Sequence, residues 1–536
     1  MAAAALAVAY LAVIVLGDPR AGLISDSGGK LATAQVMAEA RTLSPDVGYW
    51  AEDLDPEGWF HPLANTERVG DRWVQATSLP YAAATAGLWA LAGPLGVALL
   101  SAAGGVAAAL AARHLARHLG ARGDIAFWLV GLASPLAVYA VDAWEHAPAA
   151  GLALWGIALA LDADRPTRAA AACALLGAAL LLRAEVGASV ISFAVACLCV
   201  GEFRRRFTRQ PQLVVAGAAA AGSLLAVNAL LERWLLDAGV RDARASAGAV
   251  DAGSEVGRRL TDAVVTGAGL LADETASGIA VSLVLAGALL VLTLGLVGRL
   301  TLSPAATRGV TAVVVALYGL RLLDGWANVP GVLAAVPVVV LAATVTRTPP
   351  VRVLLGTALG AVPVVWAAQW KGGHVLQWGG RYLLVPTLLL LVLAAVALEG
   401  PVRRLLPARV LLGITVAVGA LGLGWHIHRT DVVAGQGQAL EALSAETVVV
   451  TDMPHLGREL GAWYDDRRWL SADVASLEEA VGIASELAPP AIALVGRTPS
   501  VRPPVNPPSI AGYHLTETWP VAALGGDLQV QVLVRD

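Results

Sequence analysis

Residues 186–231 read VGASVISFAVACLCVGEFRRRFTRQPQLVVAGAAAAGSLLAVNALL. Two apolar runs without a charged residue flank the segment 201–210, which carries four arginines. A surface helix of a soluble protein keeps one polar face, whereas these runs are apolar all round, as membrane-spanning helices are. The stretch therefore predicts two membrane helices joined by a short basic loop.

The same pattern extends over most of the chain. Of its 536 residues, 57% are hydrophobic and 15% are charged, against about a quarter charged in soluble domains, and the mean hydropathy is +0.67. We predict an all-α polytopic membrane protein with about 13 spans. The expected spans are 2–17, 80–112, 124–141, 147–161, 169–183, 186–201, 211–231, 278–298, 309–323, 328–345, 353–370, 382–399 and 410–426.

Two of these spans differ from a simple membrane helix. The segment 2–17 has neither the basic start nor the cleavage site of a signal peptide, so we expect an uncleaved first helix. The segment 80–112 is too long for one crossing, and we expect a break at Gly93-Pro94, with a re-entrant or interfacial piece before it.

Arginine-rich connectors set the topology. They recur after every second span, at 112–123, 162–168, 201–210, 298–308, 346–352 and 400–409. The positive-inside rule places such loops in the cytoplasm. We therefore expect a protein of the cytoplasmic (inner or plasma) membrane, with a cytoplasmic N-terminus and with the loops 18–79 and 232–277 outside.

The composition changes near residue 430. A strand, a turn and a helix are expected over ETVVVTDMPHLGREL, a helix over SLEEAVGIASEL, and three strands over PAIALVG and YHLTETW…GGDLQVQVLV. We predict a transmembrane domain over 1–429, whose first outer loop carries an interfacial helix, and a small extracytoplasmic α/β domain over 430–536.

The stretch GLISDSGGKL, residues 22–31, follows the first span. Its GGK resembles a phosphate loop, but Lys30 is followed by Leu31 and no strand precedes the glycines. We weigh two roles for Asp26, a helix N-cap and a general base facing the interior of the bundle. Lys30 is one of only two lysines in the chain and is a candidate substrate-binding residue.

A second polar group closes the third span, in YAVDAWEHAP. Asp142, Glu145 and His146 are spaced i, i+3, i+4 and share one face of a helix. We expect Asp142 and Glu145 to hold a divalent cation, Mg²⁺ or Mn²⁺, or His146 to contact a phosphate-bearing ligand. The alternative is a solvated helix end.

Further candidates lie at other outer helix ends. Arg183 and Glu185 follow the fifth span in LLRAEVGAS, where a local ion pair and a binding role are both open. The connector 369–386, QWKGGHVLQWGGRYLLVP, gathers donors suited to a lipid-linked phosphate, or else a belt of interfacial side chains. These donors are Lys371, His374, Arg381 and Tyr382. His61, in the first loop, is a candidate for binding the acceptor.

Several functions are excluded by missing motifs. The sequence contains no HExxH, GxSxG or paired CxxC motif, so zinc proteases and serine hydrolases drop out. We expect no nucleotide or redox cofactor and no nucleic-acid partner. The cysteines lie in apolar runs and are read as small buried hydrophobes.

These residues, in this order, resemble the GT-C superfamily of membrane glycosyltransferases, which includes protein O-mannosyltransferases and lipid A aminoarabinose transferases. The likeness rests on Asp26 after the first span, on Asp142 and Glu145 after the third, on LLRAE, and on QWGGRYLLVP before a late span. Here Asp26 is followed by Ser27, where the mannosyltransferases carry an Asp-Glu pair.

The resemblance implies an inverting glycosyltransferase of the bacterial cell envelope. It would move a sugar from a polyprenyl-phosphate donor to a glycan, lipid or protein acceptor, with Asp26 as the base. Two alternatives stay open: a transporter or flippase for a lipid-linked saccharide, and an enzyme like the O-antigen ligases or polymerases. A transporter needs ionisable groups near the midplane, whereas the charges here crowd one side of the spans.

Overall fold

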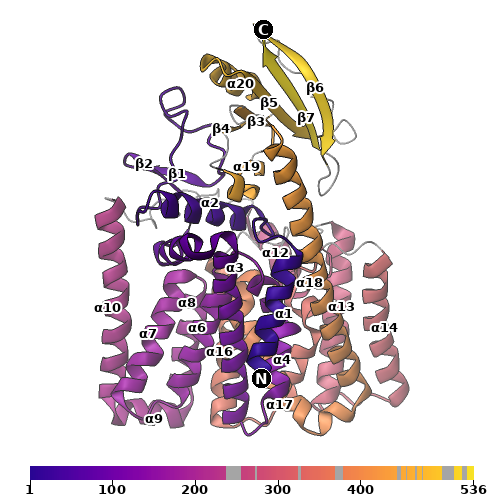
Figure 1. Cartoon of the computed structure of the whole chain (residues 1–536). Coiled ribbons are helices and arrows are strands. Elements are labelled where there is room, and N and C mark those ends of the chain that lie inside the picture. Colours follow the sequence, from indigo (N-terminus) through magenta and orange to yellow (C-terminus); the bar gives the residue numbers. More distant parts are fainter. Residues whose placement is uncertain are drawn as a thin grey trace.

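The computed structural model describes the whole chain except residues 76, 237–254, 272–274, 324–327, 369–377, 444–447, 454, 465–467, 474, 498–511 and 522–527. A bundle of helices forms the larger part, and a small domain with a sheet stands on one end of it (Figure 1). The prediction of a helical membrane protein with a C-terminal α/β domain is confirmed.

The bundle is built from helices of very different lengths. Its elements are α1 (Ala2–Leu16), α3 (Leu79–His118), α4 (Asp124–Leu132), α5 (Pro135–Ala140), α6 (His146–Leu161), α7 (Pro166–Leu182), α8 (Val186–Cys199), α9 (Gly201–Arg209), α10 (Pro211–Leu236), α12 (Glu255–Ala268), α13 (Ala276–Leu296), α14 (Pro304–Leu323), α15 (Val332–Ala335), η2 (Pro337–Thr344), α16 (Pro349–Ala368), η3 (Arg381–Leu383), α17 (Leu384–Glu399), η4 (Pro401–Arg404) and α18 (Leu406–Glu441).

Within the described residues, seven helices are long and apolar enough to cross a membrane, or eight if the bent pair α8 and α9 is one span. The other expected spans are shorter helices, such as α1, α6 and α7, or are divided by proline, as at Pro135 and Pro337. Proline lacks an N–H and disfavours helix in the residue before it, so a helix is interrupted there.

Helix α3 breaks where the sequence indicates. Ala92 and Gly93 leave helical geometry, and Gly93 adopts φ +59°, ψ −148°, just before Pro94. Backbone of this kind suits glycine because a β-carbon is strained there. The predicted break at Gly93-Pro94 is therefore present, and it separates a short first segment from the long remainder of α3.

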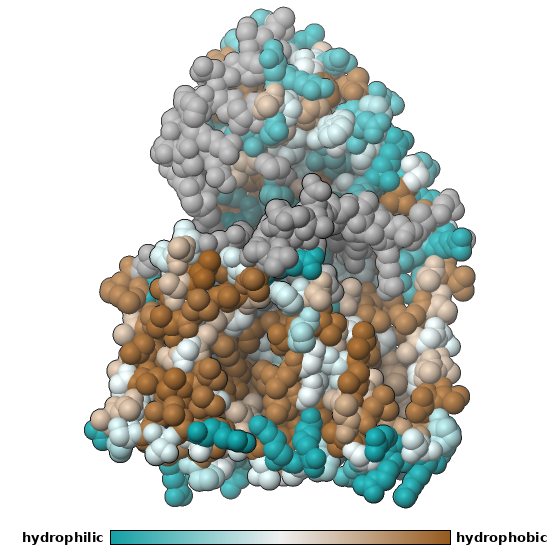
Figure 2. Space-filling model, turned by 180° about the vertical axis from the view of Figure 1, so that it is seen from behind, coloured by the Kyte–Doolittle hydropathy of each residue, from teal (hydrophilic) through white to brown (hydrophobic). Residues whose placement is uncertain are grey.

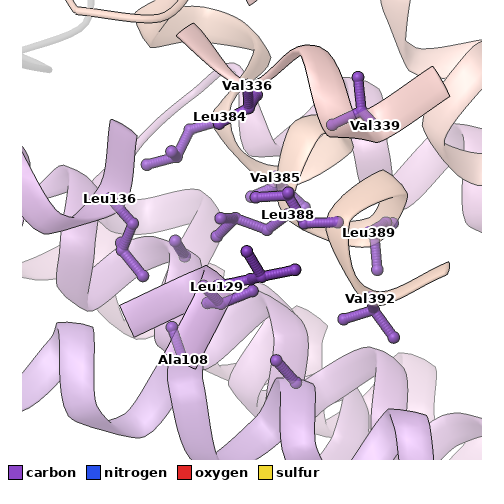
Figure 3. Packing of buried hydrophobic residues seen from close by; sticks show 14 of the residues in the cluster. Ala108, Leu129, Leu136, Val336, Val339, Leu384, Val385, Leu388, Leu389 and Val392 are labelled. Carbon is purple, nitrogen blue, oxygen red and sulfur yellow. The ribbon is translucent and has the colours of Figure 1, made fainter. Parts of the chain in front are cut away.

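Helix α17 forms the centre of the bundle. Its residues Leu384, Val385, Leu388, Leu389 and Val392 are buried and pack against side chains of α4, α5 and η2 (Figure 3). Alanine and glycine allow the surrounding helices to approach closely, as at Gly104, where α3 lies against the start of α6. Hydrophobic residues cover the sides of the bundle, and hydrophilic residues gather at its far end and over the small domain (Figure 2).

The small domain contains a five-stranded sheet in the order β4-β3-β5-β7-β6. Its elements are β3 (Val448–Thr451), α19 (Leu456–Glu459), η5 (Gly461–Trp463), β4 (Arg468–Ser471), α20 (Leu477–Glu486), β5 (Ala491–Arg497), β6 (Tyr513–Val521) and β7 (Leu528–Arg535). Strands β4, β3 and β5 are parallel to one another. Strand β7 pairs antiparallel with β5, and β6 pairs antiparallel with β7. Helix α18 runs unbroken from the bundle past residue 429 to Glu441, so one rigid element joins the two parts.

The first loop, residues 18–78, fills the space between bundle and small domain. It contains helix α2 (Ser25–Glu39) and the hairpin of β1 (Thr66–Val69) and β2 (Arg72–Gln75). Helix α2 lies across the end of the bundle and is buried on most sides, packed on α3, α19 and η5 (Figure 1). An interfacial helix was predicted here, but protein surrounds α2 more completely than one apolar face would require.

Candidate functional site

Asp26 lies in the first turn of α2, where the N-cap is Ile24, so its side chain does not cap the helix. Arg381 Nη1 donates to its Oδ2 at 2.9 Å, and Arg458 Nη1 donates to its Oδ1 at 2.7 Å. Burial raises the pKa of this carboxyl, but the charges of Arg458, Lys30 and Arg381 outweigh burial and hold it well below its ordinary range. Asp26 is therefore ionised at neutral pH.

A buried chain of ion pairs continues from the same helix face. Lys30, one turn after Asp26, lies 2.9 Å from Glu145 Oε2. Arg183 donates to Glu145 Oε1 at 3.0 Å and to Glu185 Oε1 at 2.7 Å. Burial raises the pKa of Glu145, but Lys30 and Arg183 lower it to about 2. The acidic cluster and LLRAE, predicted as separate motifs, thus form one network.

Aromatic rings line this network. Arg381 lies 4.8 Å from the ring centroid of Trp144 and 4.6 Å from that of Tyr382, and it donates to the Tyr382 hydroxyl. Both ring nitrogens of His146 are buried, and among the described residues neither has a hydrogen-bond partner. Its Nε2 lies 3.8 Å from Glu185 Oε1. Among the described residues, His146 therefore has two buried ring nitrogens without a hydrogen-bond partner, next to the cationic side chains.

We call the following set the charged cluster: Asp26, Lys30, Glu145, Arg183, Glu185, Arg381, Tyr382 and Arg458. Most of its members are residues that the sequence analysis singled out at four distant places in the chain. Lys371 and His374, predicted to join them, lie outside the described residues. His61 lies elsewhere in the first loop.

His61 packs between Tyr49 and Trp73, with ring centroids 4.9 and 5.2 Å away. Its Nδ1 accepts from the Leu63 amide at 3.2 Å, which assigns the proton to Nε2, 3.2 Å from the Gly48 carbonyl oxygen. Burial lowers the pKa of this imidazole to about 4. These contacts hold the loop together, and binding of an acceptor by His61 stays a prediction.

Asp142 anchors the chain before α2. Its Oδ1 accepts from the Leu23 amide at 3.1 Å and its Oδ2 from the Ser27 hydroxyl at 2.6 Å. Burial raises the pKa of Asp142 to about 6, against the hydrogen bonds that lower it. The oxygens of both proposed metal ligands, Asp142 and Glu145, thus have other partners, and Glu145 lies between two cations. The described residues contain no group of three or more metal-binding side chains. This arrangement does not fit the predicted divalent cation.

Arg458 is the site residue that sequence reasoning missed. It comes from α19 in the small domain, and its approach depends on Gly28 of the GGK stretch and on Gly461 of η5. A β-carbon on Gly28 would overlap the carbonyl oxygen of Arg458, and one on Gly461 would overlap that of Gly28. The glycines therefore let α19 and η5 dock directly on α2. Glycine pairs in a helix are the available signal for such an approach.

An apolar cavity of about 300 Å³ adjoins the cluster. It lies between α12, α16 and η3, and Val362, Pro363, Trp366 and Leu383 form much of its wall. Tyr382 lines it as well and also contacts Arg381. The Tyr382 side chain thus lies between the apolar cavity and the cationic side chains of the charged cluster.

No protein-family model matches this sequence, and no curated protein does. Among solved structures, the chain is similar to ArnT from Cupriavidus metallidurans bound to undecaprenyl phosphate, with 14% identity, 98% of this chain and 97% of that chain covered, and a TM-score of 0.48. It is also similar to the Archaeoglobus fulgidus oligosaccharyltransferase with Zn and sulfate, with 12% identity, 91% and 67% covered, and a TM-score of 0.47. Likeness at this level carries no argument about function, which rests on the residues of the site.

Proposed function

We propose that this chain is an inverting glycosyltransferase that moves a sugar from a polyprenyl-phosphate donor to an acceptor hydroxyl. The observation that carries the proposal is the position of Asp26. An ionised carboxylate, reachable from solvent with 27% of its side chain exposed, lies among arginines at one end of a membrane bundle and near an apolar cavity. Base, phosphate-binding cations and a place for a lipid tail thus occur together.

The donor phosphate would be held by arginines. The charged cluster contains four cations and three carboxylates, so it has one positive charge in excess. Arg183 and Arg381 both flank Tyr382, with guanidinium carbons 5.9 and 4.6 Å from its ring centroid. A guanidinium group can donate two parallel N–H···O hydrogen bonds to one phosphate. The donor phosphate would therefore bind between Arg183 and Arg381. The prenyl chain would extend into the apolar cavity on the other side of Tyr382.

The reaction is a substitution at the anomeric carbon. The acceptor hydroxyl oxygen forms a bond to that carbon while the bond from the carbon to the phosphate oxygen breaks, and the electron pair leaves with the polyprenyl phosphate. Asp26 takes the hydroxyl proton. Arg381 and Arg183 stabilise the charge that grows on the leaving phosphate. No step is assigned to a metal, because the carboxylates predicted to bind one are engaged by other groups.

The site belongs on the outer face in this proposal. Helix α9, with its arginines, lies at the end of the bundle opposite the small domain (Figure 1). Basic connectors favour the cytoplasmic side. The charged cluster, α2 and the small domain would then face away from the cytoplasm, and the reaction would take place at the cell envelope.

The test is transfer from synthetic polyprenyl-phosphate sugars by the purified chain in lipid nanodiscs. We expect Asp26→Asn to reduce kcat at least 1,000-fold, on the order of what loss of a general base costs, while donor binding persists. Glu39→Gln, on the last turn of the same helix and exposed, is the matched control and should remain active. Full activity of Asp26→Asn would overturn the assignment of the base.

A further inference from the structure

A second, polar cavity lies between the first loop and the small domain, away from the charged cluster. Its volume is about 600 Å³, which falls within the range of small-molecule sites. Trp59 and Asn65 line it from the loop, Asp473 and Ser476 from the segment that leads into α20, and Glu479 from the first turn of α20. We propose that this cavity binds a neutral saccharide, and, if the proposed function holds, that the saccharide is part of the acceptor.

The loop that carries Trp59 is held in a defined conformation. Residue Trp59 is 79% exposed, an unusual state for so large an apolar residue. Its backbone is nevertheless fixed, because the buried carboxylate of Asp55 accepts from the amides of Trp59 at 3.0 Å and Phe60 at 2.9 Å, and from the Tyr49 hydroxyl at 2.8 Å. The loop that carries Trp59 is thus held in place, and Trp59 lines the cavity with most of its surface uncovered. The apolar C–H face of a pyranose or furanose ring stacks on such a surface.

Polar groups line the cavity from both sides. On the small-domain side, the carboxylates of Glu479 and Asp473 accept hydrogen bonds from vicinal hydroxyls, and on the loop side Asn65 offers both a donor and an acceptor. Among the described residues that line the cavity there is no lysine or arginine. A phosphate or a uronic acid would therefore be repelled, which excludes an anionic sugar and is compatible with a neutral one.

The cavity is coupled to the charged cluster by one buried side chain. Gln75 Nε2 donates to the carbonyl oxygens of Leu63 at 3.2 Å and Ala64 at 3.0 Å, and both residues line the cavity. Gln75 Oε1 accepts from Arg458 Nε at 3.2 Å. Since Arg458 also pairs with Asp26, the cavity wall and the proposed base share a hydrogen-bonded connection.

The cavity spans a seam between two parts of the chain. The Ser471 amide donates to the Phe60 carbonyl oxygen at 2.9 Å, and Trp50 Nε1 donates to the Trp469 carbonyl oxygen at 2.9 Å. Loop and small domain thus form the site jointly. An acceptor glycan held there would be oriented by the small domain while its terminal hydroxyl reaches toward α2.

The experiment measures binding without catalysis. Full-length protein in nanodiscs is applied, without donor, to an array of neutral and acidic oligosaccharides, and the Kd for the best neutral oligosaccharide is then determined. We expect retention of neutral members only. Trp59→Ala and Glu479→Gln should each raise Kd about tenfold, given the energies of stacking and of charge-assisted hydrogen bonds.

Two matched controls accompany these variants. Trp234 is 74% exposed on α10 and Glu478 is the exposed neighbour of Glu479 on α20, and neither lines the cavity. Trp234→Ala and Glu478→Gln should leave Kd unchanged. Binding to no neutral glycan, or equal binding by Trp59→Ala, would overturn the site while leaving the Asp26 assignment standing. Normal glycan binding with an active Asp26→Asn would do the reverse.

Discussion

Glu145 is the carboxylate on which the buried network depends, and its removal has a cost that can be worked out. The side chains of Glu145 and Lys30 are 2% and 5% exposed. Glu145→Gln leaves Lys30 and Arg183 without their shared counter-charge, and loss of one partner of a buried pair costs about 3–5 kcal/mol. Independently, a pKa that falls from 4.5 to about 2 corresponds to about 3 kcal/mol at neutral pH.

This free energy corresponds to a measurable change in Tm. An unfolding entropy of about 2.1 cal/mol/K per residue over 536 residues gives about 1.1 kcal/mol/K, so a loss of about 3 kcal/mol lowers Tm by about 3 °C. Thermal unfolding in detergent at pH 7 is the assay. Glu486→Gln, exposed at the end of α20, is the control and should unfold with the wild type.

The pH dependence gives an independent check. Because folding lowers the pKa of Glu145, its contribution is complete above pH 4.5 and is lost as the pH falls toward 2. The difference in Tm between wild type and Glu145→Gln should therefore narrow below pH 4.5. Adding Lys30→Met to Glu145→Gln removes one uncompensated charge and should recover part of the loss. Equal Tm values for wild type and Glu145→Gln at pH 7 would refute this account of the network.

Two further predictions concern the same region. Gly28→Ala should force α19 away from α2 and speed amide hydrogen exchange in residues 456–463. Gly87→Ala should not, because no atom of the described residues lies within 4 Å of its β-position; equal exchange in both variants would contradict the docking role of Gly28. Folding raises the pKa of Asp142 from 3.8 to about 6, so its contribution to stability is lost as pH rises through 6. The Tm of the wild type should therefore rise relative to Asp142→Asn between pH 7 and pH 4, and a constant difference would refute this.

Much of the fold follows from local sequence rules. Apolar runs separated by arginine loops predict the bundle, and the step at Gly93-Pro94 predicts the break in α3, because both effects act within a few residues. Proline residues and alanine-rich stretches obscure the ends of the spans in the sequence. The segment expected to span 328–345 is a short helix and a 3-10 segment, α15 and η2, since Pro337 interrupts it. Strand β4 was missed because its pairing with β3 is a tertiary contact.

The site could be predicted only in part. Charges at helix ends on one side of a membrane are close in space if the bundle is compact, so the sequence places Asp26, Asp142, Glu145 and Arg381 at one end of the bundle. The sequence does not predict which of these charges pair with one another. A carboxylate such as that of Glu145 suggests a metal ligand, and only the fold shows that Lys30 and Arg183 lie beside it. Arg458 is more distant still, since its position depends on how the small domain docks.

A carboxylate held by two arginines is strongly ionised and, for that reason, a weak base. On the proposed function, Asp26 must lose part of this stabilisation before it can take a proton. The donor supplies the means, because its phosphate competes for Arg381, the residue that lies between Asp26 and Tyr382. Once Arg381 turns to the phosphate, the pKa of Asp26 rises toward its ordinary value. Basicity at Asp26 would thus follow donor binding, and an acceptor hydroxyl would be activated only when there is a sugar for it to attack.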